Sequence, residues 1–319
     1  APGNIESFTG RILDNVKTVK EEQLISGKFR FRPDDVVYGK INPQLGKYFY
    51  ATVNGLTSAD AYVFNGKNGL KQKFLFALLQ TSDFFKYSVS VSKRSGMPKI
   101  NRDELNAYSF LMPSEEEQDR IGSYLLQLDH LITLHQRKCE ETKSLKKYML
   151  QKMFPENGNC VPKIRFSGFA DAWEQRKLGE VAQEFKSGNS LKADEIDITG
   201  DYPVYGGNGL RGYTSTYNHD GEYALIGRQG ALCGNMNYSV GKAYFTEHAV
   251  VVKADENNDT RFLYYMLDTM NLGQYSDQSA QPGLAVNKLV KLENQFPMKE
   301  EQQRIGWYFS NIDHLITLH

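Results

Sequence analysis

The chain has 319 residues, with 38 lysines and arginines against 38 aspartates and glutamates, so its net charge gives no general attraction to nucleic acid. No apolar run reaches the roughly 20 residues of a membrane-spanning helix, and no basic-then-apolar segment typical of a secretion signal opens the chain. The three cysteines, Cys139, Cys160 and Cys233, are too far apart for a disulfide framework or a zinc-binding CxxC pair. These features favour a protein of the reducing cytoplasm.

A first globular domain is expected over residues 1–112. Short strand-like runs, VVYGKI from Val36 and AYVF from Ala61, lie between turns that contain Gly, Asn and Pro, and the run FLFALLQTSDFFKYS (74–88) is typical of a helix. Residues 1–113 carry 16 Lys and Arg against 10 Asp and Glu. This is the only part of the chain with a visible positive electrostatic footprint.

A long helix is expected over residues 113–155. Ser114 followed by Glu117 is a capping box, and the acidic residues of the first turn suit the helix dipole. Apolar residues then recur at alternating spacings of four and three, which is the pattern of a coiled-coil seam. The predicted seam residues are Ile121, Leu125, Leu128 and Ile132, and the helix is expected to end at Pro155.

A second globular domain is expected over residues 156–297 and a second long helix over residues 298–319. The runs YALIGR, AVVVKA and RFLYYMLDTM repeat the strand, strand and helix order of the first domain. Residues 156–298 carry 13 Lys and Arg against 18 Asp and Glu, so the second domain is acidic. The seam pattern returns in the second helix at Ile305, Phe309, Ile312 and Ile316.

The second half of the chain repeats the first. The sequence DHLITLH occurs at 129–135 and again at 313–319, and the same shift of 184 aligns RIG at 120–122 with RIG at 304–306. Upstream the shift is 188, which aligns YGK at 38–40 with IGR at 226–228. Such collinear matches indicate a duplicated module, a mixed α+β domain followed by a helix. A helix with one narrow apolar stripe needs a partner, so we expect the two helices to form an antiparallel coiled coil with pseudo-twofold symmetry.

No catalytic motif stands out. The glycine-rich segment 206–212 lacks the spacing of a dinucleotide-binding or phosphate-binding loop and is interpreted as a turn. His130 and His135 are five residues apart, so they do not share a helix face as metal ligands at i and i+4 do. We therefore expect no catalytic residue and no metal site.

Polar loop segments are interpreted as contacts to DNA. Residues 86–102 carry five basic residues and no acid, which suits phosphate contacts. The aligned residues 276–289 are rich in Gln and Ser, and Gln can read an adenine edge. A solvated loop is the alternative for any one of these residues. The predicted contacts are Lys40, Asn42, Lys93, Arg94, Lys99, Asn101, Lys186, Asn208, Arg211, Arg228, Gln229, Gln278, Gln281 and Lys288.

Several short phrases carry a resemblance to a known family. AWEQRKLGE at 172–180 resembles a phrase of the specificity subunits of type I restriction–modification enzymes. YGGNG at 205–209, IGR at 226–228, QPGL at 281–284 and EQQRI at 301–305 are also similar to that family, as is the order of domain, helix, domain, helix. The resemblance covers essentially the whole chain.

This resemblance implies a function. Each globular domain would be a target recognition domain that reads one half of a split DNA sequence, and the antiparallel helices would set the spacer and dock two methyltransferase subunits. The chain itself would not be an enzyme and would bind no cofactor. S-adenosylmethionine, ATP and Mg would belong to the methyltransferase subunits and to the restriction subunits that join them.

The two copies differ in length. The phrase AWEQRKLGE and the segment YGGNG have no counterpart in the first copy, in which only 38 residues precede Gly39. The first helix continues beyond DHLITLH, whereas the second does not. We therefore expect a longer protein that extends past both ends of this chain. Two other functions remain open: a two-headed coiled-coil scaffold that binds proteins, and the recognition part of a larger methyltransferase or endonuclease.

Overall fold

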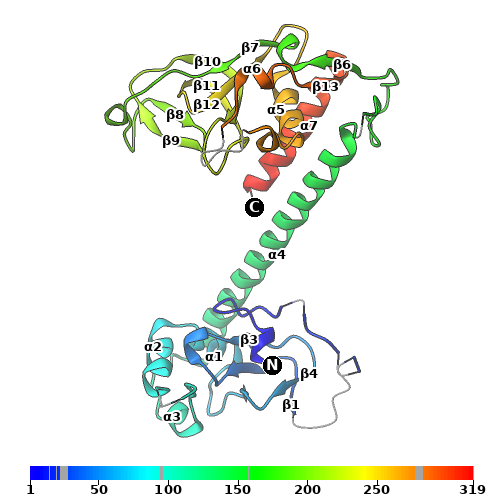
Figure 1. The fold of residues 1–319 in the computed structure, drawn as a ribbon. Coiled ribbons are helices and arrows are strands. Elements are labelled where there is room, and N and C mark those ends of the chain that lie inside the picture. The colour runs from blue at the N-terminus through cyan, green and yellow to red at the C-terminus, as the bar shows by residue number, and fades with distance from the viewer. Residues whose placement is uncertain are drawn as a thin grey trace. The chain divides into compact units, whose positions relative to one another are not determined.

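The chain folds into two compact units, unit 1 (residues 1–135) and unit 2 (residues 136–319), in a computed structural model (Figure 1). The structure describes residues 1–13, 15–18, 20–21, 28–93, 96–156, 158–276 and 283–318, with only the backbone of Lys28. Helix α4 (Glu115–Met153) contributes its first part to unit 1 and its second part to unit 2. Within the described ranges, no helix combines the length and apolar character needed to cross a bilayer.

The described residues of unit 1 form two small antiparallel sheets and three short helices that precede α4. One sheet pairs β1 (Lys28–Phe31) with β4 (Gly55–Ser58), and the other has the order β3-β2-β5, formed by Tyr48–Tyr50, Val36–Gly39 and Ala61–Phe64. Helices α1 (Gln72–Leu79), α2 (Ser82–Val91) and α3 (Arg102–Asn106) follow. Alternation along β2 buries Tyr38 against Phe76 and Phe84 of the helices and Val37 against Phe49 on the opposite face.

The helix predicted over residues 74–88 is two helices. The break lies at Gln80 and Thr81, where the Thr81 hydroxyl accepts a hydrogen bond of 3.3 Å from the N–H of Phe84 and so caps α2. A threonine that satisfies a free amide at a helix start is a strong N-cap. This local signal outweighs the apolar periodicity that runs across it.

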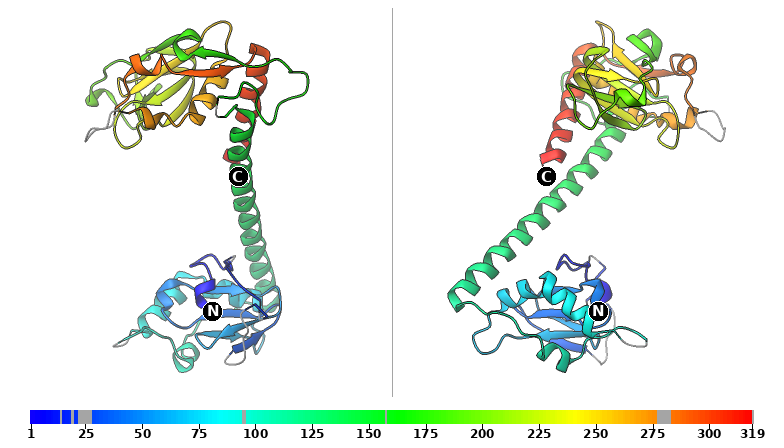
Figure 2. Two further views of the ribbon diagram at one scale, coloured as in Figure 1. Left: turned by 45° about the vertical axis from the view of Figure 1, so that its right-hand side comes forward. Right: turned by 90° about the vertical axis from the view of Figure 1, so that its left-hand side faces the viewer.

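Among its described residues, unit 2 has a six-stranded sheet with the order β7-β12-β10-β11-β8-β9. These strands are Ala182–Ser187, Ala249–Ala254, His219–Gly227, Met236–Phe245, Tyr202–Gly206 and Gly209–Thr214. Figure 2 shows the unit from two further sides. A second sheet pairs β6 (Glu174–Lys177) with β13 (Glu293–Phe296), and the helices are α5 (Thr260–Thr269), α6 (Val286–Leu289) and α7 (Lys299–Leu318). The main core joins Ile226 and Val250 of the large sheet to Phe262 of α5 and Phe309 of α7.

Each long helix contacts its own domain through the same two features, a buried glutamine and a closely packed glycine. The side-chain oxygen of buried Gln118 accepts the N–H of Lys71 at 3.0 Å, and that of buried Gln302 accepts the N–H of Asp259 at 3.0 Å. One turn later, Gly122 lies against the start of α1 and Gly306 against the start of α5. An added Cβ would collide at Gly122 and would be tightly crowded at Gly306. The sequence repeat therefore corresponds to a repeat of tertiary contacts.

In unit 2, the second part of α4 runs along α7 in the opposite direction. Three contacts establish this: Cys139 Sγ to the Ile316 carbonyl oxygen at 3.9 Å, Lys146 Nζ to Asp313 Oδ1 at 2.6 Å, and the stacked rings of Phe154 and Phe309 at 6.0 Å. The tyrosine hydroxyl of Tyr265 on α5 also donates to Asp313, at 2.7 Å.

The predicted seam residues have different environments in the two helices. In α7, Ile305, Phe309 and Ile312 are buried and Ile316 packs against the same core, so this stripe covers its own domain as well as α4. In the first part of α4, the side chains of Leu125, Leu128 and Ile132 are 40%, 37% and 54% exposed, while Ile121 is half-buried. Their place in a seam stays a prediction.

Candidate nucleic-acid interface

In unit 1, the predicted basic contacts gather where β2 ends. The amide of Ile100 donates to the carbonyl of Lys40 at 3.0 Å, and Ile41 forms a β-bridge with Lys99. These backbone contacts hold residues 96–100 beside the end of β2. The side chains of Lys93 and Lys99 are exposed, whereas that of Lys40 is half-buried with its Nζ 5.1 Å from the ring centre of Tyr62. Arg94 lies outside the described residues. The structure thus brings Lys40 and Lys99 together.

Two of the predicted contacts in unit 1 have structural roles. The side-chain oxygen of Asn101 accepts the N–H of Glu104 at 2.9 Å, and the Glu104 carboxylate accepts the N–H of Asn101 at 2.8 Å, which is a reciprocal cap of α3. Asn42 adopts a left-handed backbone conformation with φ of 52°, which Asn tolerates better than most residues, and its side chain accepts from Gln44. The fold alone therefore accounts for both residues, and their contact to DNA stays a prediction.

In unit 2, Arg228 and Gln229 occupy the place that Lys40 and Ile41 occupy in unit 1. The amide of Leu284 donates to the carbonyl of Arg228 at 2.9 Å, and Gln229 forms a β-bridge with Gly283. These contacts are those of Ile100 with Lys40 and of Lys99 with Ile41, shifted by the sequence repeat. Gln278 and Gln281 fall outside the described residues, and their contact to DNA stays a prediction. Gly283 and Leu284, which follow them in the chain, lie beside the end of β10.

The turn between β8 and β9 lies beside this same end of β10. Gly207 and Asn208 form a two-residue loop, and a Cβ at Gly207 would lie 2.9 Å from the His248 carbonyl and 3.6 Å from the Arg228 nitrogen. The interpretation of the glycine-rich segment as a turn is confirmed for Gly207 and Asn208, whereas Gly206 ends β8 and residues 209–212 lie on β9. Exposed Asn208, exposed Gln229 and half-buried Arg228 therefore share one end of the sheet, and exposed Arg211 follows on β9.

His248 belongs to the same surface and was missed in the sequence. Its ring nitrogen Nδ1 lies 3.2 Å from the side-chain oxygen of Gln229, and its Nε2 lies 3.5 Å from Glu247. The available signal was its position directly before Ala249, which the repeat aligns with Ala61. That a residue preceding β12 meets one following β10 depends on strand pairing, which the sequence pattern did not specify.

The two remaining predicted contacts lie on other elements. Lys186 is exposed on β7, and its Nζ is 3.2 Å from a carboxylate oxygen of Glu184, which also meets His219 at 2.8 Å. Because a carboxylate partly neutralises this lysine, it is a weaker phosphate ligand than an unopposed one. Lys288 is exposed on α6, a short helix that closely follows Gly283 and Leu284, the residues in backbone contact with Gln229 and Arg228.

The cysteine beside Arg228 has a structural contact. Burial raises the pKa of the Cys233 thiol, and this thiol donates to the Arg228 carbonyl at 3.3 Å. Among the residues with described placement, no group of three or more His, Cys, Asp and Glu side chains is arranged to hold a metal ion.

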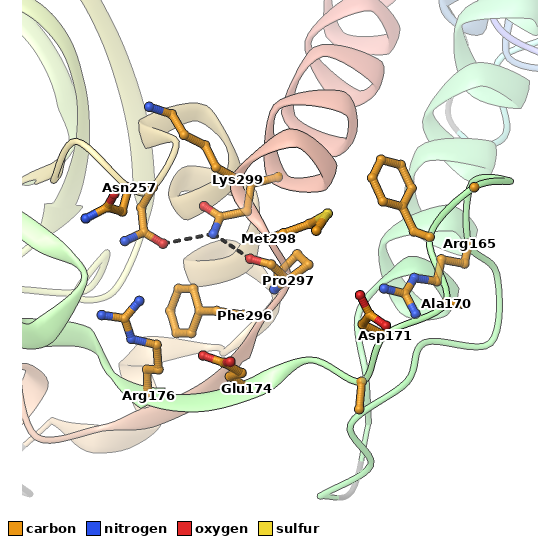
Figure 3. A pocket seen from close by; sticks show the side chains of 15 residues that line it. Arg165, Ala170, Asp171, Glu174, Arg176, Asn257, Phe296, Pro297, Met298 and Lys299 are labelled. Atoms are coloured by element: carbon orange, nitrogen blue, oxygen red, sulfur yellow. Dashed lines mark hydrogen bonds between the residues drawn. The ribbon is translucent and has the colours of Figure 1, made fainter.

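A separate cavity of about 310 Å³ lies at the start of α7 (Figure 3). Its walls carry both signs of charge, because Arg176 and Lys299 line it together with Asp171 and Glu174, so it does not offer the single-sign potential that attracts nucleic acid. None of the predicted DNA contacts lines it. Arg165, which also lines the cavity, makes two hydrogen bonds of 2.7 Å to the buried carboxylate of Glu301.

The fold and this surface define a class of protein with two mixed α/β units. In each unit a polar loop is held at the end of a sheet by backbone contacts, and the domain packs against a long helix. The sequence model described as "Type I restriction modification DNA specificity domain" matches residues 1–144 and again residues 170–319. The chain belongs to this family. The two matches coincide with the two copies of the sequence repeat.

Individual relatives agree with the family assignment. The chain is 43% identical over 146 residues to the type I restriction enzyme EcoprrI specificity subunit of Escherichia coli, a match that covers 44% of this chain and 36% of that protein. It is 34% identical over 128 residues to the EcoDI specificity subunit of Escherichia coli, covering 40% of this chain and 28% of that one. These matches thus span about a third of the length of each relative.

One solved structure supports the fold over most of the chain. The S subunit of a type I restriction–modification system from M. genitalium superposes with a TM-score of 0.72 at 16% sequence identity, covering 90% of this chain and 78% of that one. At this level of identity the likeness concerns the fold alone. The expected mixed α/β architecture with two domains is confirmed.

Proposed function

We propose that this chain is the DNA sequence-specificity part of a type I restriction–modification complex, in which each unit reads one half of a bipartite target. The observation that carries this proposal is the double family match. It is supported by the equivalent backbone contacts that hold one polar loop beside Lys40 and another beside Arg228. The positive charge of residues 1–113 favours phosphate contacts in unit 1. In unit 2, polar side chains such as Asn208 and Gln229 suit the reading of base edges.

The long helices are proposed to form an antiparallel coiled coil that sets the spacer and docks two methyltransferase subunits. The opposed directions of α4 and α7 within unit 2 support the antiparallel arrangement. The exposed apolar side chains of Leu125, Leu128 and Ile132 offer a further stripe for helix packing. Insertion or deletion of residues within 136–150 is expected to change the spacer length of the target and to leave both half-sites unchanged.

The chemistry is assigned to partners. We propose that this chain is not an enzyme and binds no cofactor, and that S-adenosylmethionine, ATP and Mg bind to the methyltransferase and restriction subunits of a cytoplasmic complex. This proposal rests on the family, whose relatives are named specificity subunits.

A mobility-shift selection tests the function. The chain with its methyltransferase subunit is mixed with duplexes of randomised sequence, and bound duplexes are sequenced. Two short conserved blocks separated by a fixed spacer are expected. Absence of any sequence-selective shift at every salt concentration would contradict the proposal and favour a protein-binding scaffold, and a methyltransferase domain in the same reading frame would favour a larger enzyme.

A further inference from the structure

His248 and Gln229 form an accessible pair of side chains at the end of β10. The ring atom Nδ1 of His248 lies 3.2 Å from the side-chain oxygen Oε1 of Gln229. An amide oxygen only accepts hydrogen bonds, so Nδ1 carries the hydrogen and donates it. The imidazole therefore fixes which side of the Gln229 amide is the oxygen and which is the nitrogen.

The backbone of both residues is held in place. The N–H of Arg228 donates to the carbonyl of His248 at 2.9 Å, and Gln229 forms a β-bridge with Gly283. The turn at Gly207 packs against the same carbonyl, because a Cβ at Gly207 would lie 2.9 Å from it. The freedom that remains to Gln229 is rotation of its side chain, and the hydrogen bond from His248 restrains this rotation.

A glutamine amide with a fixed orientation presents its acceptor and its donor in one order. Adenine offers the complementary order in the major groove, with N7 as acceptor and the N6 amino group as donor. The second lone pair of Oε1 stays available to the N6 amino group while Nε2 donates to N7. Guanine has acceptors at both places, N7 and O6, so the fixed oxygen would face another oxygen. A glutamine without a partner could turn its amide over and would discriminate less.

Unit 1 has the same backbone arrangement without this pair. The N–H of Lys40 donates to the carbonyl of Asp60 at 2.9 Å, as the equivalent N–H of unit 2 does to the carbonyl of His248. The repeat aligns Asp60 with His248 and Ile41 with Gln229. A carboxylate and an isoleucine do not present this order of donor and acceptor, so recognition by the pair is confined to unit 2.

We propose that Gln229 recognises an adenine in the half-site of unit 2 and that His248 is the residue that positions its amide, an inference that rests on the proposed function. Contact with DNA phosphates is the competing role. A phosphate contact carries no sequence information and needs no fixed amide orientation. The restraint that His248 places on Gln229 therefore favours the recognition of a base.

The mobility-shift selection, repeated with variants of this pair, tests the proposal. Gln229→Ala is expected to lower the preference for adenine at one position of one half-site by roughly tenfold, as the loss of a bidentate base contact does. His248→Leu is expected to lower the preference at the same position by a smaller factor, because the amide remains but is free to rotate. His248→Asn is expected to retain the preference, because the asparagine Nδ2 takes the place of the histidine Nδ1 and also donates.

Gln183→Ala is the matched control. Gln183 is exposed on β7 next to the pairing of Ala182 with Ala254, at the end of the sheet opposite to Gln229. Its replacement is expected to leave the selected sequences unchanged. Replacing the selected adenine by 7-deazaadenine removes N7, which is expected to weaken binding of the native protein and to have little effect on the Gln229→Ala protein.

The outcomes separate this inference from the proposed function. If the native protein selects two sequence blocks but Gln229→Ala weakens every duplex alike, the pair contacts phosphates and the inference is overturned. It is also overturned if His248→Leu leaves the selected sequences unchanged, or if 7-deazaadenine weakens the native and Gln229→Ala proteins equally. If the native protein selects no sequence, the proposed function fails and the inference fails with it.

Discussion

Gly122→Ala is the sharpest test of the joint between α4 and unit 1. At an exposed helix position this change stabilises by about 1 kcal/mol, because alanine has the higher helix propensity. At Gly122 the added Cβ would lie 2.7 Å from the backbone of Lys73 and Phe74. Carbon atoms pack favourably at about 3.5–4.0 Å, so α1 and α4 would have to separate by most of an ångström. Overpacking of this kind costs about 1–3 kcal/mol, which exceeds the gain in propensity.

The expected result is therefore a change of sign, with Gly122→Ala less stable than the native protein by up to about 2 kcal/mol. Chemical denaturation gives the total effect, and hydrogen exchange of the α1 amides locates it, since two units need not unfold in one transition. Gln127→Ala, at an exposed position of the same helix, controls for propensity. A Gly122→Ala protein that is more stable and keeps its α1 protection would refute the close approach of the two helices.

Three further changes probe the other joints. Arg165→Leu leaves the buried carboxylate of Glu301 unpaired and is expected to cost about 3–5 kcal/mol in denaturation, most of which Glu301→Leu should restore in the double variant. A double-mutant cycle of Lys146→Ala and Asp313→Asn is expected to give a coupling of about 1 kcal/mol that falls at high salt, and zero coupling would contradict the contact between α4 and α7. Burial raises the pKa of the Asp129 carboxyl, so its ionised form opposes folding, and Asp129→Asn should stabilise unit 1 at neutral pH. This advantage should vanish below the ordinary aspartate pKa of about 4, and its persistence there would refute the assignment.

Local signals in the sequence were sufficient for some elements, such as α4, but not for the contacts between them. The capping serine and the apolar spacing predicted α4, in which the Ser114 hydroxyl accepts the Glu117 amide at 3.3 Å. The repeat also aligned Lys40 with Arg228, and in both units the backbone carbonyl of this residue accepts a hydrogen bond from the equivalent loop. The parallel pairing of β8 with β11 was not predictable in this way, because it depends on contacts between distant segments. The position of His248 beside Gln229 was missed for the same kind of reason.

The loops held by backbone bonds explain how one duplicated fold can serve two different half-sites under the proposed function. In both units the bonds that hold the loop are made by backbone atoms, between Ile100 and Lys40 and between Leu284 and Arg228. Backbone bonds do not depend on side-chain identity, so the bridge accepts Lys99 in one unit and Gly283 in the other. The buried Gln118 and Gln302, by contrast, hold the helices with their side chains, and these residues are identical in the two copies. The side chains that hold the helices are thus the same in the two copies, whereas those of the loops differ. A protein that recognises two unrelated half-sites with one duplicated fold requires this arrangement.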